Sequence, residues 1–226
     1  MNARARIIAI DGPVASGKST VGRALAKRLG LRFLDTGVMY RAVTRVALDG
    51  GVALGDDAAL TKIARAIEFR FAPAMTPDDL PAIRCAGKEI TAALFASEVD
   101  RAVSQVSAVR GVRDALVQRQ REIAAAGGIV MVGRDIGTVV LSHAPLKIYL
   151  RASVEERARR RCEERRAKGE TSDFAQILAD LRRRDEMDST RALSPLVAAA
   201  DAVAVDTDGL TIAQVVERIA ALAAAA

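Results

Sequence analysis

The stretch Gly12-Pro13-Val14-Ala15-Ser16-Gly17-Lys18-Ser19-Thr20 matches the pattern G-x-x-x-x-G-K-[ST], which is typical of loops that bind the phosphates of a nucleoside triphosphate. A short β-branched run, residues 6–10, precedes it, and the apolar residues that follow it within 21–29 fall on one helical face. Strand, glycine-rich loop and helix are the context that this function requires. A glycine turn that happens to precede Lys-Ser is the weaker interpretation.

Each part of this motif has a chemical task in holding phosphate. Gly12 and Gly17 let the backbone approach the anion, which successive amide N–H groups and a helix N-terminus then bind. The amine of Lys18 is expected to reach the β- and γ-phosphates, and the hydroxyl of Ser19 to ligate Mg²⁺. The stretch therefore predicts a triphosphate site with magnesium as its cofactor.

Composition limits the classes of protein to consider. A chain of 226 residues, half of them apolar, buries about 70% of its unfolded surface, which suits one α/β domain with a modest insertion. Aromatic residues make up only 3% and tryptophan is absent, which argues against an RNA-binding sheet that stacks bases. The net charge of +6 indicates an anionic partner, and residues 151–168 supply much of it, with eight arginines and lysines against four glutamates.

The cysteine count and the apolar runs bear on the compartment. Cys85 and Cys162 lie in different settings, so neither a disulfide framework nor a metal site is expected. The N-terminal apolar run is too short for a secretory signal, and no run approaches the ~20 residues needed to cross a bilayer. We expect a cytoplasmic protein with no membrane partner.

Strands and helices alternate along most of the chain. Apolar strands are expected near residues 6–10, 31–34, 129–132, 146–150 and 202–205, with amphipathic helices between them. This order predicts a parallel sheet with helices on both faces and ligands at the carboxyl ends of the strands. Two helix starts carry capping signals, Ser153-x-x-Glu156 and Asp173-x-x-Gln176.

Residues 68–91 have a different pattern. Phe69 and Phe71 alternate with charged residues, three prolines follow, and Ile83 and Cys85 alternate again before a turn at Gly87-Lys88. Alternation of this kind is typical of antiparallel strands. We expect a small antiparallel sheet inserted into the α/β chain.

Charged residues that follow predicted strands are candidates for a site. Arg41 comes soon after Asp35-Thr36-Gly37, where it can clamp an acceptor phosphate by bidentate hydrogen bonds. By itself, however, this pattern favours an ordinary turn with a solvated arginine. Arg134-Asp135 directly follows an apolar strand, and a solvated loop is the equal alternative there.

Two helical segments are ambiguous when read alone. Arg184, Asp188 and Arg191 share one helix face, and spacing alone favours a surface ladder of ion pairs, which contributes little to stability. The arginine-rich helix from residue 153 can be a lid that closes on the triphosphate, a nucleic-acid surface or a solvated helix with interleaved glutamates.

Taken in order, these segments resemble the bacterial cytidylate kinase family nearly from end to end. The resemblance is carried by residues 10–20, Leu34-Asp35-Thr36-Gly37 with Tyr40-Arg41, Ser104-Gln105-Val106, Val112-Arg113, residues 133–138, and Arg184-Asp185 with Asp188 and Arg191. It implies transfer of the γ-phosphoryl group of ATP to CMP and dCMP with Mg²⁺. The resemblance also favours a binding site over a surface ladder of ion pairs for Arg184, Asp188 and Arg191. For Arg134-Asp135 it favours a binding site over a solvated loop.

The resemblance also implies the roles of individual residues. ATP would be bound by Gly12, Pro13, Val14, Ala15, Ser16, Gly17, Lys18, Ser19 and Thr20, with Ser19 on the metal. The CMP site would comprise Thr36, Arg41 and Arg134 at the phosphate, Ser104, Arg113 and Asp135 at the cytosine, and Arg184, Asp188 and Arg191 at or near the sugar. Lys18 and Arg134, with Arg157 and Arg161 from the lid, would be catalytic.

The expected organisation is a three-layer P-loop α/β fold with a parallel central sheet and a short helical lid. The core would comprise residues 1–37, 108–155 and 190–226, the monophosphate-binding region residues 38–107, and the lid residues 156–185. The protein is expected to be a monomer and to bind no nucleic acid. Two alternatives remain. One is another small P-loop kinase of the adenylate, thymidylate or shikimate type, and the other is a P-loop switch or nucleic-acid-binding protein.

Overall fold

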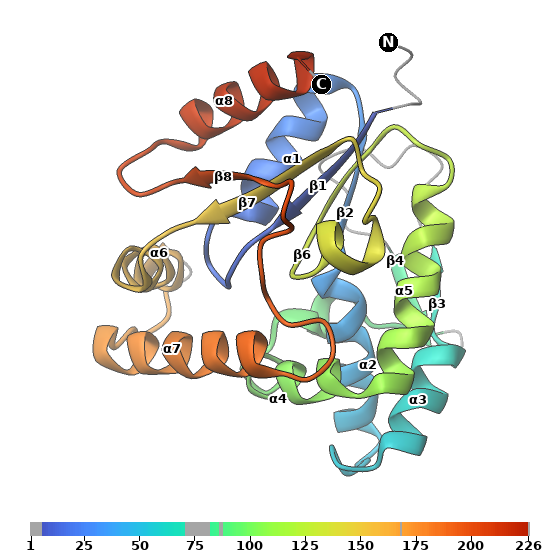
Figure 1. The fold of residues 1–226 in the computed structure, drawn as a ribbon. Coiled ribbons are helices and arrows are strands. Elements are labelled where there is room, and N and C mark those ends of the chain that lie inside the picture. Colours follow the sequence, from blue (N-terminus) through green and yellow to red (C-terminus); the bar gives the residue numbers. More distant parts are fainter. Residues whose placement is uncertain (1–5, 71–81, 86–87, 168, 226) are drawn as a thin grey trace. The chain divides into compact units, whose positions relative to one another are not determined.

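A computed structural model describes residues 6–70, 82–85, 88–167 and 169–225 of the chain. Its α/β architecture contains a five-stranded central sheet in the order β2-β6-β1-β7-β8 and a three-stranded sheet in the order β3-β4-β5 (Figure 1). The pairings of β1 with β7 and of β7 with β8 are parallel. Backbone contacts divide the chain into two compact units, one formed by Met1–Ile7 and Ala26–Met131, the other by Ile8–Leu25 and Val132–Ala226.

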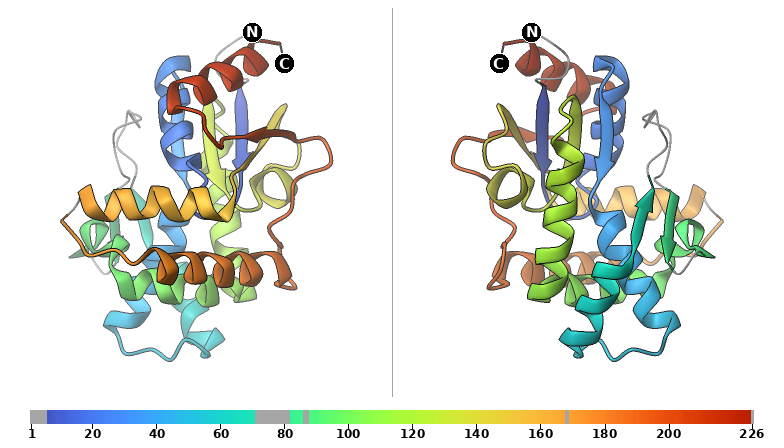
Figure 2. Two further views of the ribbon diagram at one scale, coloured as in Figure 1. Left: turned by 90° about the vertical axis from the view of Figure 1, so that its left-hand side faces the viewer. Right: turned by 90° about the vertical axis from the view of Figure 1, so that its right-hand side faces the viewer.

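The second unit holds the phosphate loop and the arginine-rich helix. Its elements are most of β1 (Ile7–Asp11), the first part of α1 (Lys18–Leu29), β7 (Leu146–Arg151), α6 (Val154–Ala167), α7 (Phe174–Thr190), β8 (Val203–Asp206) and α8 (Ile212–Ala225). In the register of the sheet, Ile10 pairs with Ile148, which pairs with Val203. Figure 2 shows α6 and α7 running side by side.

The first unit is mainly helical. It comprises β2 (Arg32–Asp35), α2 (Gly37–Asp49), α3 (Asp57–Ala66), the small sheet of β3 (Glu68–Arg70), β4 (Ala82–Cys85) and β5 (Lys88–Glu89), a 3₁₀ helix (Thr91–Phe95), α4 (Ser97–Ala108), α5 (Arg110–Ala124) and the start of β6 (Ile129–Gly133). Helix α3 packs against α5, and α2 against α4.

The predicted fold class and the inserted antiparallel sheet are confirmed. Strand β3 pairs antiparallel with β4, with Phe69 opposite Ile83, and β4 pairs antiparallel with β5. The proline-rich turn and Gly87 lie outside the described residues. Strands β1 and β6 are almost wholly buried, as expected for apolar strands covered on both faces.

One capping prediction is half right. The amide of Glu156 donates to Ser153 Oγ at 3.2 Å, but the amide of Ser153 donates to the carboxylate of Asp208, at 3.0 and 3.1 Å. The carboxylate of Glu156 instead pairs with Arg159 and Arg160. A carboxylate from the loop after β8 thus replaces the reciprocal half of the capping box. Asp173 caps α7 as predicted, by accepting from the amides of Ala175 and Gln176.

Candidate functional site

The phosphate loop joins the end of β1 to the start of α1. The Lys18 side chain is almost buried, and its Nζ donates to the carbonyl of Pro13 at 2.9 Å. A Cβ on Gly12 would lie 2.5 Å from the carbonyl oxygen of Leu150, so no larger residue fits there. Ala15 has a φ of 59°, a left-handed conformation that non-glycine residues seldom adopt. The hydroxyl of Ser16 is fully buried and has no hydrogen-bond partner within the described chain, which fits a loop shaped around an anion.

Asp11, the last residue of β1, ties the loop to the segment after β6. Its two carboxylate oxygens accept hydrogen bonds from the amides of Ile136 and Gly137, at 2.8 and 2.7 Å. Burial raises the pKa of Asp11 to about 6, although these two amides oppose the shift and Asp135 adds to it. The segment that carries Arg134 and Asp135 is therefore fixed to the strand that carries the phosphate loop.

Arg134 connects the loop to α7. Its Nε donates to Asp188 Oδ2 at 2.9 Å, and its Nη1 donates to the carbonyl of Gly12 at 3.2 Å. Burial alone would raise the pKa of Asp188, but the ion pair with Arg134, with help from Arg191 and Arg184, holds that pKa below its ordinary value. The predicted pair Arg134 and Asp188 thus comes together, and Asp188 is not part of an exposed ladder.

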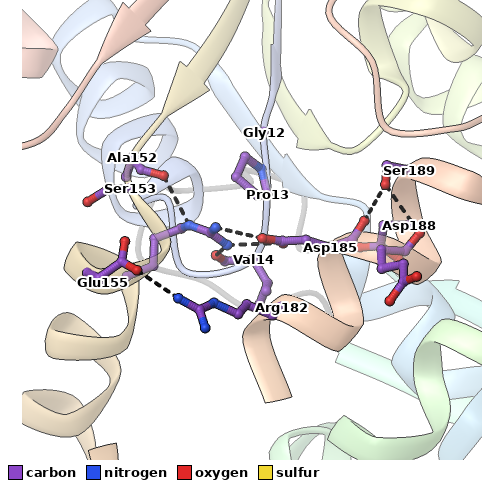
Figure 3. Close-up of polar contacts among 12 residues, drawn as sticks. Gly12, Pro13, Val14, Ala152, Ser153, Glu155, Arg182, Asp185, Asp188 and Ser189 are labelled. Atoms are coloured by element: carbon purple, nitrogen blue, oxygen red, sulfur yellow. Dashed lines mark hydrogen bonds and ion pairs between the residues drawn. The ribbon is translucent and has the colours of Figure 1, made fainter. Parts of the chain in front are cut away.

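The arginines of α6 occupy three different environments. Arg157 is buried and donates to the carbonyls of Ala152 and Val14 and to the carboxylate of Asp185. Figure 3 shows these three partners, which come from the segment before α6, the phosphate loop and α7. Arg160 donates to the hydroxyl and carbonyl oxygens of Thr207, and its Nη1 lies 3.8 Å from the position that a Cβ on Gly17 would take.

Arg161, the other predicted lid arginine, pairs with Glu164 of its own helix at 2.8 Å. The two arginines predicted for the lid therefore differ in their contacts. Arg157 is attached to the phosphate loop, and Arg161 makes an ion pair within α6.

The predicted acceptor residues of the first unit form two small networks. Arg41 donates to the carbonyl of Leu94 at 3.1 Å and to Asp100 at 2.6 Å, with its guanidinium 5.2 Å from the ring centre of Phe95. Thr36 lies buried at the N-cap position of α2.

The second network brings Ser104 and Arg113 together through Ser107. The hydroxyl of Ser107 donates to the carbonyl of Ser104 at 2.9 Å, and Arg113 donates to the carbonyl of Ser107 at 3.1 Å. The buried Arg113 also lies over the ring of Tyr40, at 5.5 Å from its centre.

Comparison with known proteins identifies the family. The family model for cytidylate kinase matches residues 8–225. The chain belongs to the cytidylate kinase family. A cytidylate kinase of Nocardia farcinica is 48% identical over 219 residues, covering 96% of this chain and 93% of the relative. A cytidylate kinase of Bacillus licheniformis is 45% identical over 212 residues, with 94% and 93% covered.

A solved structure agrees in fold. An uncharacterized protein from Eubacterium ventriosum superposes with a TM-score of 0.53 at 13% identity, covering 98% of this chain and 99% of that one. As a member of the cytidylate kinase family, the chain is a phosphotransferase with a nucleotide-binding P-loop.

Sequence reasoning gave no role to several residues that the geometry makes prominent. Asp11 ends a buried strand, which is the same signal that singled out Arg134-Asp135. Asp185 belongs to a segment that carries the resemblance but received no role, and Asp100 carried no signal, because a single carboxylate on a helix is usually a solvated side chain. Their partners, Arg157 and Arg41, lie 28 and 59 residues away along the chain.

The site also fits the nucleotide-bound magnesium that kinase chemistry uses. Among the described residues, no three histidine, cysteine or acidic side chains gather into a metal site. Mg²⁺ is commonly held by substrate phosphates with few protein ligands, and the Ser19 hydroxyl at the start of α1 has the position in sequence that the P-loop motif gives to such a ligand. Within the described chain no helix is long and apolar enough to span a membrane.

Proposed function

We propose that this protein transfers the γ-phosphoryl group of ATP to CMP and dCMP, forming ADP and CDP or dCDP. Besides family membership, the observation that best supports the proposal is the double contact of Arg134. This residue donates to Gly12 of the phosphate loop and to Asp188 of α7. A guanidinium anchored at the loop can attract the phosphate of an acceptor next to the donor, and phosphoryl transfer depends mainly on such positioning and charge.

In the proposed reaction the phosphate loop holds the donor. Residues 12–20 bind the triphosphate, and Lys18 neutralises negative charge on its β- and γ-phosphates. Bound Mg²⁺, ligated by Ser19, would supply further positive charge to the phosphates. Arg157 and Arg161 are proposed as the catalytic arginines of the lid. Arg161 approaches the transferring group when α6 closes, while Arg157 acts at the phosphate loop, to which it is attached.

The acceptor is proposed to bind through charged and buried polar groups. Thr36, Arg41 and Arg134 hold its phosphate, while Ser104, Arg113 and Asp135 read the edge of cytosine. Arg184 and Asp188 bind the sugar, with Arg191 beside them. A site that hydrogen-bonds a base edge rejects bases with a different pattern, because its buried groups would be left unpaired.

The remaining features of the proposal concern the whole chain. It is a monomeric cytoplasmic enzyme that acts on small nucleotides. The core is proposed to comprise residues 1–37, 108–155 and 190–226. The monophosphate-binding region is residues 38–107 and the lid residues 156–185.

A panel of acceptors tests the proposed function. Release of ADP from ATP and Mg²⁺ would be measured with CMP, dCMP, UMP, AMP, dTMP and shikimate at equal concentrations. We expect the largest kcat/KM for CMP or dCMP. A preference for AMP, dTMP or shikimate would overturn the proposal in favour of another small P-loop kinase.

A further inference from the structure

Two aspartates of α7 reach the phosphate loop through arginines. Asp188 binds Arg134, which donates to the carbonyl of Gly12. One turn earlier on the same helix, Asp185 binds Arg157, which donates to the carbonyl of Val14 (Figure 3). Each bridge runs from a carboxylate through a guanidinium to a backbone oxygen. Only the first involves an aspartate that the proposed function already uses.

The second bridge occupies most of the donors of Arg157. Its Nη1 and Nη2 donate to the two oxygens of Asp185, at 3.0 and 2.6 Å. Nη1 also donates to the carbonyl of Val14, and Nε to the carbonyl of Ala152, both at 3.2 Å. The Arg157 side chain is only 5% exposed. A guanidinium has five N–H donors, so one held in this way is arranged to fix the backbone around it.

The contact with Val14 orients one peptide group of the phosphate loop. The carbonyl of Val14 and the amide of Ala15 belong to the same planar peptide, and in the trans form they point in opposite directions. Because Arg157 holds the oxygen, the N–H of Ala15 is turned to the other side of that peptide. Ala15 has the left-handed φ of 59°, which costs free energy in a residue with a Cβ.

We propose that Asp185 is a positioning residue for the donor nucleotide: through Arg157 it fixes the Val14–Ala15 peptide in the orientation that binds the triphosphate. The inference rests on the proposed function in taking ATP as the ligand of the loop, but it does not depend on the identity of the acceptor.

The same two helices provide a matched control. Glu155 of α6 and Arg182 of α7 form an ion pair at 3.0 Å, in which both side chains are more than half exposed. Figure 3 shows Glu155 and Arg182 on facing helices. This pair links α6 to α7 as Asp185 and Arg157 do, whereas the carbonyls of the phosphate loop accept hydrogen bonds from Lys18, Arg134 and Arg157. A variant that breaks it measures the effect of the helix contact alone.

The test compares wild-type protein with Asp185→Asn, Arg157→Lys and Glu155→Gln. Affinity for MgATP would be measured by titration calorimetry without acceptor, KM and kcat by ADP release, and folding by melting temperature. We expect Asp185→Asn and Arg157→Lys each to raise the Kd and KM for ATP about tenfold, the size typical of one charge-assisted hydrogen bond. KM for CMP should stay within twofold in both variants, and Glu155→Gln should stay within twofold in every constant.

Three results would overturn the inference. One is an Asp185→Asn protein that binds ATP as well as Glu155→Gln does. Another is a large fall in kcat for Arg157→Lys with unchanged ATP affinity, which would make Arg157 a catalytic residue at the transferring group. The third is failure of Asp185→Asn to fold while a folded Arg157→Lys binds ATP normally. A wild-type protein that binds ATP but phosphorylates no cytidylate would refute the proposed function and leave the calorimetric comparison valid.

Discussion

Among single residues, Lys18 has the most direct proposed role in turnover. Replacement by alanine removes the charge that faces the β- and γ-phosphates, and we expect kcat to fall by about 10²–10³-fold or more. The melting temperature should change little, because the Lys18 amine donates to a carbonyl of its own loop, that of Pro13, and not to another helix or strand. Lys27→Ala on the exposed face of the same helix is the control. A near-normal kcat for Lys18→Ala would refute the mechanism.

The raised pKa of Asp11 predicts a pH effect on stability. The pKa of Asp11 rises from its ordinary value of 3.8 to about 6 on folding. At pH values between these two, the folded chain therefore binds a proton at Asp11 that the unfolded chain does not. This contribution to stability is therefore full below pH 4 and disappears as the pH rises through 6. Asp11→Asn removes the titration. We expect the difference in free energy of unfolding between wild type and Asp11→Asn to fall by about 2 kcal/mol from pH 4.5 to 7, measured by urea denaturation. A difference that is constant with pH would contradict the assignment.

Among the elements, the packing of α3 against α5 depends on a glycine. A Cβ on Gly111 would lie 2.9 Å from the Cβ of Thr61 and closer still to its Oγ1, which donates to the carbonyl of Asp57. Rotation of the threonine cannot relieve a clash at its own Cβ. Overpacking costs about 1–3 kcal/mol, against a gain of about 1 kcal/mol in helix propensity. A clash with a Cβ belongs at the upper end of that cost, so we expect Gly111→Ala to lower the free energy of unfolding by up to about 2 kcal/mol.

The control is Gly55→Ala, in the turn before α3, because no atom beyond its chain neighbours lies within 4 Å of a Cβ placed there. Its unfolding free energy should stay within about 0.5 kcal/mol of wild type. Equal stability of the two variants would show that α3 moves away from α5 without cost.

For the whole molecule, the proposed function predicts stabilisation by the acceptor. A ligand that binds only the folded chain adds about 2.7 kcal/mol at one hundred times its Kd. In a chain of this size that corresponds to a rise in Tm of roughly 5–10 °C. We expect CMP to raise the Tm by this amount and AMP at the same concentration to raise it by less than half as much, measured by differential scanning calorimetry. Equal shifts would contradict a cytosine-specific site.

Prediction from sequence succeeded where the signal is local. The strand–loop–helix unit at residues 7–29, the small antiparallel sheet predicted within residues 68–91 and the cap at Asp173 all depend on residues close along the chain. The capping box at Ser153 was only half right, because the carboxylate that completes it belongs to Asp208, 55 residues away. No pattern among residues near Ser153 predicts that its amide donates to Asp208 and not to Glu156.

The sequence by itself determined the kind of molecule: a P-loop α/β kinase of the cytidylate family with named candidate residues at the ends of its strands. Only the tertiary structure decided which partners those residues have. Arg157 and Val14 are 143 residues apart, and Asp11 and Ile136 are 125 apart. The periodicity of apolar residues is enough to specify which face of a helix or strand is buried, because the hydrophobic effect depends on apolar area and not on the direction of particular bonds. Hydrogen bonds to Val14 and Asp11 require particular atoms at 2.7–3.2 Å, and only the folded chain sets those distances.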